Sequence, residues 1–226
     1  FGVVGIYIAT FSLTQAQTLW GVVPRGGQDG LGTIFKLTDQ FADLTPVKDF
    51  ETALSAAKPE NTVLCVASNG RMYGLSKNGG TFDRGVLFEF DPATNSSATK
   101  IEFHDEIGES PTGSLFAASN GKLYGCTSEG GANGEGVFFE YQPSTNAFRK
   151  LNDFSSGLGS FPFGGVVQGA NGRLYGMTYR GGTNEAGVIF EFDLNTEAYE
   201  VVYSFEALSG GYPKGDLVQA PNGKFY

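Results

Sequence analysis

Three acidic residues near the middle of the chain, Asp105, Glu106 and Glu109, carry side chains that could do chemistry. Two carboxyl groups on either side of a sugar can act as acid and base in glycoside hydrolysis, and carboxylate oxygens also bind Ca²⁺. His104 precedes them and is the single histidine of the chain, so the sequence offers neither a histidine cluster for a metal nor a repeated Ser-His-Asp arrangement. We interpret His104 and the three acids as a solvated loop.

A second set of carboxylates recurs along the chain. Glu89, Glu140 and Glu191 each stand between two aromatic residues, in a Phe-Glu-Phe or Phe-Glu-Tyr triplet. A ring of such carboxylates could meet cations or sugar hydroxyls. The same alternation also fits a strand with one buried aromatic face and one solvent face. We favour this second interpretation, which places the three glutamates on the solvent side.

Glycine-rich segments provide the other candidate sites. Residues 128–134 lack the Gly-Lys-Ser/Thr ending of a phosphate-binding loop and precede no predicted helix, so we interpret such segments as turns. Variation on a fixed scaffold is where binding specificity usually lies. The residues that vary at one position of these loops, or lie near it, are therefore the predicted ligand-binding residues: Arg25, Asn78, Phe82, Glu129, Tyr179 and Arg180. The sequence indicates no catalytic residue, no metal ligand and no cofactor.

These loops belong to a repeat of 51 residues. Tyr73, Tyr124, Tyr175 and Tyr226 are each 51 apart, and Trp20 takes the place of the tyrosine 53 residues before Tyr73. A glycine follows the first four of these five landmarks directly, a glycine pair comes six residues after each of those four, and a phenylalanine comes fifteen residues after each, at Phe35, Phe88, Phe139 and Phe190. Such agreement predicts one structural unit, repeated at about residues 19–72, 73–123, 124–174 and 175–226.

Each unit is predicted to hold four short strands and no helix. In one copy the first strand lies near residues 166–168 and turns at Asn171-Gly172, a dipeptide that favours a two-residue hairpin. Alternating residues then place strands at 173–178, 188–192 and 199–205. A longer Gly/Pro-rich link leads to the next unit. This order predicts an all-β chain, a β-propeller of four-stranded antiparallel blades.

The two ends of the sequence carry further expectations. Residues 1–16 match the apolar part of a truncated signal peptide, with residues 17–226 as the propeller repeats. A buried first strand is the alternative. A membrane span is not expected, because the apolar run is shorter than the about 20 residues that a span needs. The first copy lacks its first strand, and the last copy stops after its opening hairpin. We therefore expect an incomplete ring with further blades, rather than a four-bladed ring closed by residues 215–220.

Composition limits the partners. Lys and Arg number 15 against 24 Asp and Glu, so the net charge of −9 repels phosphate backbones and a nucleic-acid partner is not expected. The two cysteines, Cys65 and Cys126, occupy apolar positions of different repeats. We expect buried free thiols there rather than a disulfide.

The motif Leu-Tyr-Gly-x-Thr-x-x-Gly-Gly, followed by Gly-x-x-Phe-Glu-Phe, resembles that of the GloVer-type (choice-of-anchor) tandem-repeat proteins over residues 19–226. The resemblance implies bacterial export, a C-terminal anchoring segment and a propeller-like fold, and implies no activity. The first repeat departs from the pattern, with residues 22–24 lacking the threonine and Lys36 replacing the glutamate. The period also fits kelch blades, but the glycine pair precedes the Phe-Glu-Phe strand and no partner tryptophan is present.

Two functions fit these features. The first is a secreted or cell-surface, non-catalytic recognition module that binds an extracellular glycan or protein through loops on a propeller. The second is an extracellular carbohydrate-active hydrolase or lyase that uses carboxylates gathered at one rim. The absence of recurring histidines, cysteines or paired acids favours the first.

Overall fold

The computed structural model describes residues 18–37, 44–50, 56–60 and 62–226. The predicted signal segment, residues 1–16, lies outside the described residues. The described residues form strands and turns. They include no helix, and therefore none that could cross a membrane.

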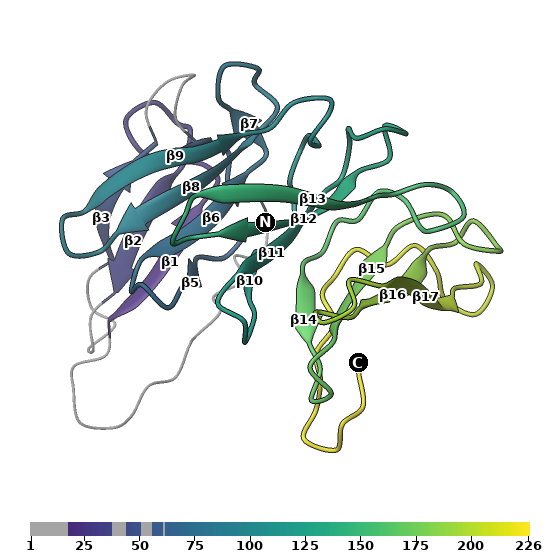
Figure 1. Ribbon diagram of the computed structural model, residues 1–226. Coiled ribbons are helices and arrows are strands. Elements are labelled where there is room, and N and C mark those ends of the chain that lie inside the picture. The colour runs from purple at the N-terminus through teal and green to yellow at the C-terminus, as the bar shows by residue number, and fades with distance from the viewer. Residues whose placement is uncertain (1–17, 38–43, 51–55, 61) are drawn as a thin grey trace.

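Four antiparallel sheets follow one another in chain order and are the blades (Figure 1). Blade 1 has three strands, β1 (Leu19–Val23), β2 (Thr33–Leu37) and β3 (Leu44–Asp49). Blades 2 and 3 have four strands each: β5 (Cys65–Val66), β6 (Met72–Ser76), β8 (Val86–Asp91) and β9 (Ser96–Glu102), then β10 (Phe116–Ala117), β11 (Leu123–Thr127), β12 (Val137–Gln142) and β13 (Ala147–Asp153).

Blade 4 also has four strands, β14 (Val166–Gln168), β15 (Leu174–Thr178), β16 (Val188–Phe192) and β17 (Tyr199–Ser204). A separate two-stranded pair joins β4 (Ala56–Ala57) to β7 (Asn78–Gly79). Beyond β17, Val218 and Tyr226 exchange backbone hydrogen bonds, so the final segment forms a hairpin with itself. The predicted β-propeller fold, with a three-stranded first blade, is confirmed.

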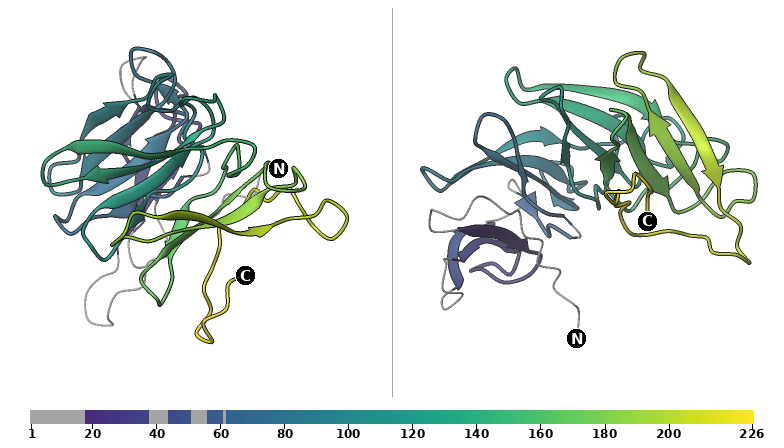
Figure 2. Two further views of the ribbon diagram at one scale, coloured as in Figure 1. Left: turned by 45° about the vertical axis from the view of Figure 1, so that its right-hand side comes forward. Right: turned by 90° about the horizontal axis from the view of Figure 1, so that it is seen from below.

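The sheets are stacked face to face along an arc, so each gap between blades holds its own apolar core (Figure 2). Between blades 1 and 2, Phe50 packs with Phe88 and Phe90; between blades 2 and 3, Tyr73 and Phe103 pack with residues of β12. The third core, between blades 3 and 4, includes Cys126. Middle strands are therefore covered on both faces, and β8 and β12 are buried over five consecutive residues each.

Both cysteines are free thiols, as expected, with Cys126 buried and Cys65 half-buried. Burial raises the pKa of Cys65 to about 11, so this thiol stays protonated at neutral pH. Burial also raises the pKa of the Cys126 thiol. Neither thiol is a reactive nucleophile in this environment.

The glycine after each landmark aromatic residue makes room for a phenylalanine on the neighbouring strand. Gly125 lies directly opposite Phe139 in the sheet, and a Cβ atom at Gly125 would lie 2.8 Å from Cζ of the Phe139 ring. The same ring fills the same space at three other glycines, Gly21, Gly74 and Gly176. The repeated Tyr-Gly and Phe signals in the sequence are thus two halves of one packing contact.

We predict that Gly125→Ala lowers the free energy of unfolding by about 1–3 kcal/mol, because the added methyl group forces the Phe139 ring out of a filled core. The matched control is Gly157→Ala, since Gly157 has open space around its Cβ position. Urea unfolding of both variants measures the difference. Equal stability of the two variants would show that the glycine is not needed to seat the ring.

Candidate functional site

The two ends of the blades have different roles. One end of each blade carries the loop between its second and third strands and the crossover to the next blade. In blade 3, for example, the end of β11 at Thr127, the start of β12 at Val137 and the end of β13 at Asp153 lie side by side. We call this end the loop rim and the opposite end, which carries the Asn-Gly hairpins, the hairpin rim. The six predicted ligand-binding residues lie at the loop rim, five of them in loops and Asn78 in the short strand β7.

Backbone contacts tie neighbouring blades together along the loop rim. Glu109 of one crossover pairs with Glu129 of the next blade's loop, and Ser160 pairs with Arg180 in the same way. The crossover is also bonded to the preceding loop, since Phe161 N–H donates to the Glu135 carbonyl at 2.9 Å. The loop rim is therefore one connected surface rather than a set of separate loops.

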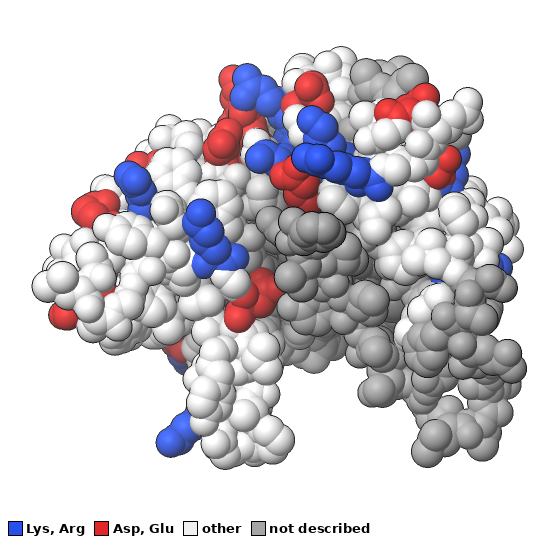
Figure 3. Space-filling model, turned by 180° about the vertical axis from the view of Figure 1, so that it is seen from behind, with Lys and Arg blue, Asp and Glu red and all other residues white. Residues whose placement is uncertain are grey.

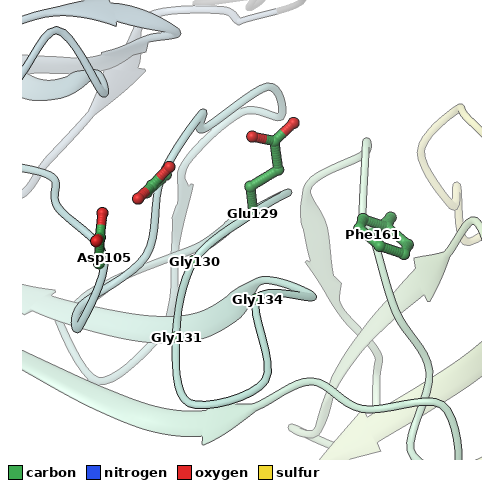
Figure 4. A pocket seen from close by; sticks show the side chains of 7 residues that line it. Asp105, Glu129, Gly130, Gly131, Gly134 and Phe161 are labelled. Atoms are coloured by element: carbon green, nitrogen blue, oxygen red, sulfur yellow. The ribbon is translucent and has the colours of Figure 1, made fainter.

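An open pocket of about 430 Å³ lies on this surface between blades 2 and 3. Its lining combines the acidic crossover with the glycine-rich loop: Asp105, Glu109, Glu129, Gly130, Gly131, Gly134 and Phe161. Figure 4 shows Asp105 and Phe161 on opposite sides of the pocket, with Glu129 and the glycine-rich backbone between them. Carboxylates, exposed backbone and one aromatic ring thus share a single cavity.

The acidic crossover is not the solvated loop that the sequence predicted. Asp105 and Glu106 are exposed, but Glu109 is only 5% exposed and forms an ion pair with Arg84. Burial raises the pKa of Glu109, and a hydrogen bond with Asp105 raises it further. That hydrogen bond lowers the pKa of Asp105. The two pKa values are therefore shifted in opposite directions, and Asp105 keeps its charge more readily than Glu109.

This acidic pair occurs at one blade junction. At the next two junctions the residues equivalent to Glu109 are Ser160 and Gly211, and those equivalent to Arg84 are Glu135 and Ala186. Scaffold residues recur in every copy, so a set present once is not required by the fold. The single appearance marks the pocket as a candidate site that the repeat itself does not explain.

His104 is half-buried and packs beside Phe82, with 5.5 Å between the two ring centroids. The structure thus places the single histidine against a predicted ligand-binding residue, where the sequence indicated a solvated residue. Phe82 is 56% exposed. No group of three or more His, Cys, Asp or Glu side chains among the described residues is placed to hold a metal ion.

Tyr179 and Arg180 belong to a second cluster on the loop rim, at blade 4. The Tyr179 ring contacts Phe163 and Tyr212, with centroid distances of 5.3 and 5.4 Å. Lys214 Nζ lies 5.0 Å from the Tyr179 centroid, and Arg180 Cζ lies 5.8 Å from it. Arg25 and Asn78 lie apart from both clusters. Arg25 is exposed in the first loop, and Asn78 of β7 pairs with Ala57 of β4.

Glu89, Glu140 and Glu191 are buried, and the prediction that they face solvent is wrong. They are 5, 7 and 8% exposed, and for Glu89 and Glu140 neighbouring blades cover both faces of the strand. In blades 2 to 4 the landmark tyrosine donates its hydroxyl to the glutamate, and the asparagine of the Asn-Gly hairpin donates to that hydroxyl. In blade 3 these residues are Tyr124 and Asn120. A basic residue two positions after the asparagine completes an ion pair with the glutamate.

This Asn-Tyr-Glu-base network lies near the hairpin rim, away from the pocket. Burial by itself would raise the pKa of Glu140, but hydrogen bonds and charge from Arg149 and Lys122 hold the pKa below its ordinary value. Burial raises the pKa of Tyr124 to about 12, so the phenol stays a donor. The glutamates are therefore structural acceptors, with no lone pairs presented to a ligand. In the first repeat, Trp20 replaces the tyrosine of this network and Lys36 replaces the glutamate.

Several residues of the two rim clusters were not predicted from the sequence, namely Arg84, Phe161, Phe163, Tyr212 and Lys214. Differences between copies are a signal for Phe161 and Tyr212, because the equivalent residue of the second repeat is Ser110. The crossover residues reach the rim only because neighbouring blades are stacked, which spacing alone does not show.

Comparisons with known proteins give a family and a fold. The family model described as the Gloeobacter/Verrucomicrobia repeat matches residues 9–226. No curated protein matches the chain. Among solved structures, the extracellular domain of a one-component system from B. thetaiotaomicron has a TM-score of 0.59 at 14% identity, covering 92% of this chain and 24% of that one.

Two further solved structures are similar. TolB from Acinetobacter baumannii has a TM-score of 0.56 at 14% identity, covering 91% of this chain and 45% of that one. A gluconolactonase from Xanthomonas campestris has a TM-score of 0.55 at 12% identity, covering 93% and 72%. The chain spans less than half of the first two proteins. These likenesses support the β-propeller fold alone.

We predict that Glu140→Gln lowers the free energy of unfolding at pH 7 by about 1–3 kcal/mol, since Lys122 and Arg149 lose a charged acceptor. The depressed pKa of Glu140 means that its contribution is present above the unfolded-state pKa and disappears as pH falls through the folded-state pKa. Stability of the variant should therefore vary less between pH 7 and pH 3 than that of the wild type. The control Glu200→Gln changes an exposed glutamate; a matching pH slope in wild type and Glu140→Gln would contradict the prediction.

Proposed function

Because this chain belongs to the Gloeobacter/Verrucomicrobia repeat family and folds as a β-propeller, we propose that it is a non-catalytic recognition module of the cell exterior. The loop rim binds an extracellular glycan or protein. The observation that carries this proposal is the gathering of residues that vary between copies, on a scaffold that does not vary, around one pocket of about 430 Å³.

The chemistry of the loop rim favours a glycan over a protein. Phe82, Phe161 and Tyr212 offer aromatic rings at separate blade junctions, while Asp105 and Glu129 offer hydrogen-bond acceptors beside them. Sugar rings stack their apolar faces on aromatic side chains and bond their hydroxyls to carboxylates. The rings are spaced along the rim, which suits an extended polymer better than one compact ligand.

The charge pattern argues against a nucleic-acid partner, and a similar solved structure supports an exported protein. On the face shown in Figure 3, Lys and Arg side chains stand beside Asp and Glu side chains, so the described residues there form no continuous basic surface for nucleic acid. One similar structure is the extracellular domain of a one-component system from B. thetaiotaomicron. Export also agrees with the predicted signal segment at residues 1–16.

A carbohydrate-active hydrolase is the second candidate, because the Asp105 and Glu109 carboxyl groups interact with each other in the lining of the pocket. The acidic crossover and the glycine-rich loop lie on the same rim, as such an enzyme requires. A hydrogen-bonded carboxyl pair is nevertheless closer together than the about 5–5.5 Å of retaining enzymes or the about 6.5–9.5 Å of inverting ones. The pair leaves no room for a sugar between its carboxyl groups, which favours binding.

We predict that the protein without residues 1–16 binds members of a glycan array, and that Phe161→Ala and Glu129→Gln each weaken binding to the best ligand about 10-fold or more, about 1.4 kcal/mol. Thr145→Ala, an exposed change in a turn of the hairpin rim, is the matched control and should leave affinity unchanged.

Uniform silence on the array would exclude glycan binding and leave a protein partner. The hydrolase alternative has its own readout, the release of reducing ends from bound polysaccharide. If the wild type releases reducing ends and both Asp105→Asn and Glu109→Gln abolish that release, the protein is an enzyme rather than a binding module.

A further inference from the structure

The cluster at blade 4 points to a class of ligand. We call Phe163, Tyr179, Arg180, Tyr212 and Lys214 the aromatic-cationic site. Lys214 Nζ lies 5.6 Å from the Phe163 ring centroid and 5.0 Å from that of Tyr179, so one ammonium group faces two rings. Tyr212 is 42% exposed and contacts Tyr179 from the other crossover. Aromatic faces and positive charge therefore meet at one exposed place.

The two cations of this site have no acidic partner among the described residues. Other arginines of blades 2 to 4 form ion pairs, including Arg84 with Glu109 and Arg149 with Glu140 and Glu197. Arg180 and Lys214 instead lie over aromatic rings. In a chain with a net charge of −9, two exposed cations without described carboxylate partners are available to an anion.

The repeat does not require this cluster. Tyr179 stands where the two preceding repeats have Lys77 and Ser128, and Arg180 stands where they have Asn78 and Glu129. The scaffold role at this position is visible in Ser128, which is buried and donates its hydroxyl to the Ser110 carbonyl at 2.8 Å. The aromatic ring of Tyr179 makes no such bond across the blades, so its presence calls for a different explanation.

We propose that the aromatic-cationic site binds an acidic saccharide, with a sugar ring stacked on Tyr212 and the sugar carboxylate held by Arg180 and Lys214. A guanidinium group bonds a carboxylate through two N–H groups, and an ammonium group adds a second positive charge. The acidic pocket between blades 2 and 3 repels the same anion. The polymer is therefore placed in one direction, with its charged unit at blade 4 and hydroxyls towards Asp105 and Glu129.

This inference rests on the proposed recognition function and narrows it to uronate-containing glycans. The probe is an oligogalacturonate of about ten units, and its fully methyl-esterified form is the neutral comparison. Isothermal titration of the protein without residues 1–16 at low salt should show the free acid binding at least about 10-fold more tightly than the ester. Arg180→Gln with Lys214→Gln should remove that preference, and Tyr212→Ala should weaken both ligands.

Lys224→Gln is the matched control, because Lys224 is an exposed cation beside the Asn222-Gly223 hairpin, away from the loop rim, and the change removes a positive charge. The control should bind the free acid like the wild type, and circular dichroism verifies that each variant is folded. An equal loss of affinity in Lys224→Gln would show a general charge effect and overturn the site. Tighter binding of sulfated dextran would overturn the carboxylate assignment.

Failure of this inference and failure of the proposed function differ in outcome. Binding of the ester or of other neutral glycans without any preference for the acid overturns the acidic site and leaves glycan recognition intact. No binding to any saccharide overturns both.

Discussion

Stacking of blades on both faces is the constraint on which the rest of this structure depends. A strand in the middle of a blade has no solvent face, so β8 and β12 are buried over five residues each. The cores between the blades are built from aromatic rings, with Phe138 and Phe190 in contact at 5.7 Å between centroids across one gap. Glycine next to each landmark aromatic residue leaves room for a ring on the adjacent strand. Composition rich in glycine and phenylalanine is the direct result.

Burial on both faces also explains the repeated polar residues. A glutamate in the middle of a buried strand is costly unless it is paired and hydrogen-bonded. The chain meets that cost with a tyrosine hydroxyl, an asparagine that orients this hydroxyl, and a basic residue beside the hairpin. These residues are occupied with one another at the hairpin rim. Ligand recognition is left to the loop rim, where side chains differ from one copy to the next.

The repeat made the fold predictable, and it limited what could be predicted about the site. Strand 188–192 and the Asn-Gly hairpins followed from spacing and alternation, because these are local properties. The solvent side predicted for Glu140 is wrong because alternation tells one face of a strand from the other but does not show that neighbouring blades cover both. Glu109 and Arg84 are 25 residues apart, and Phe163 and Lys214 are 51 apart; their meeting depends on how successive blades stack. Variation between copies predicted four of the six loop residues, and Phe82 and Tyr179 were predicted because they lie near them. Three of the six, Glu129, Tyr179 and Arg180, lie in the two rim clusters.

Hydrogen exchange with and without a bound polysaccharide tests most directly whether the loop rim is the recognition face. If the loop rim is the recognition face, added ligand slows amide exchange in residues 105–109, 128–136 and 179–187. Exchange in the Asn-Gly hairpins at 69–70, 120–121 and 171–172 stays unchanged. Protection confined to those hairpins, with no change along the loop rim, would contradict the account.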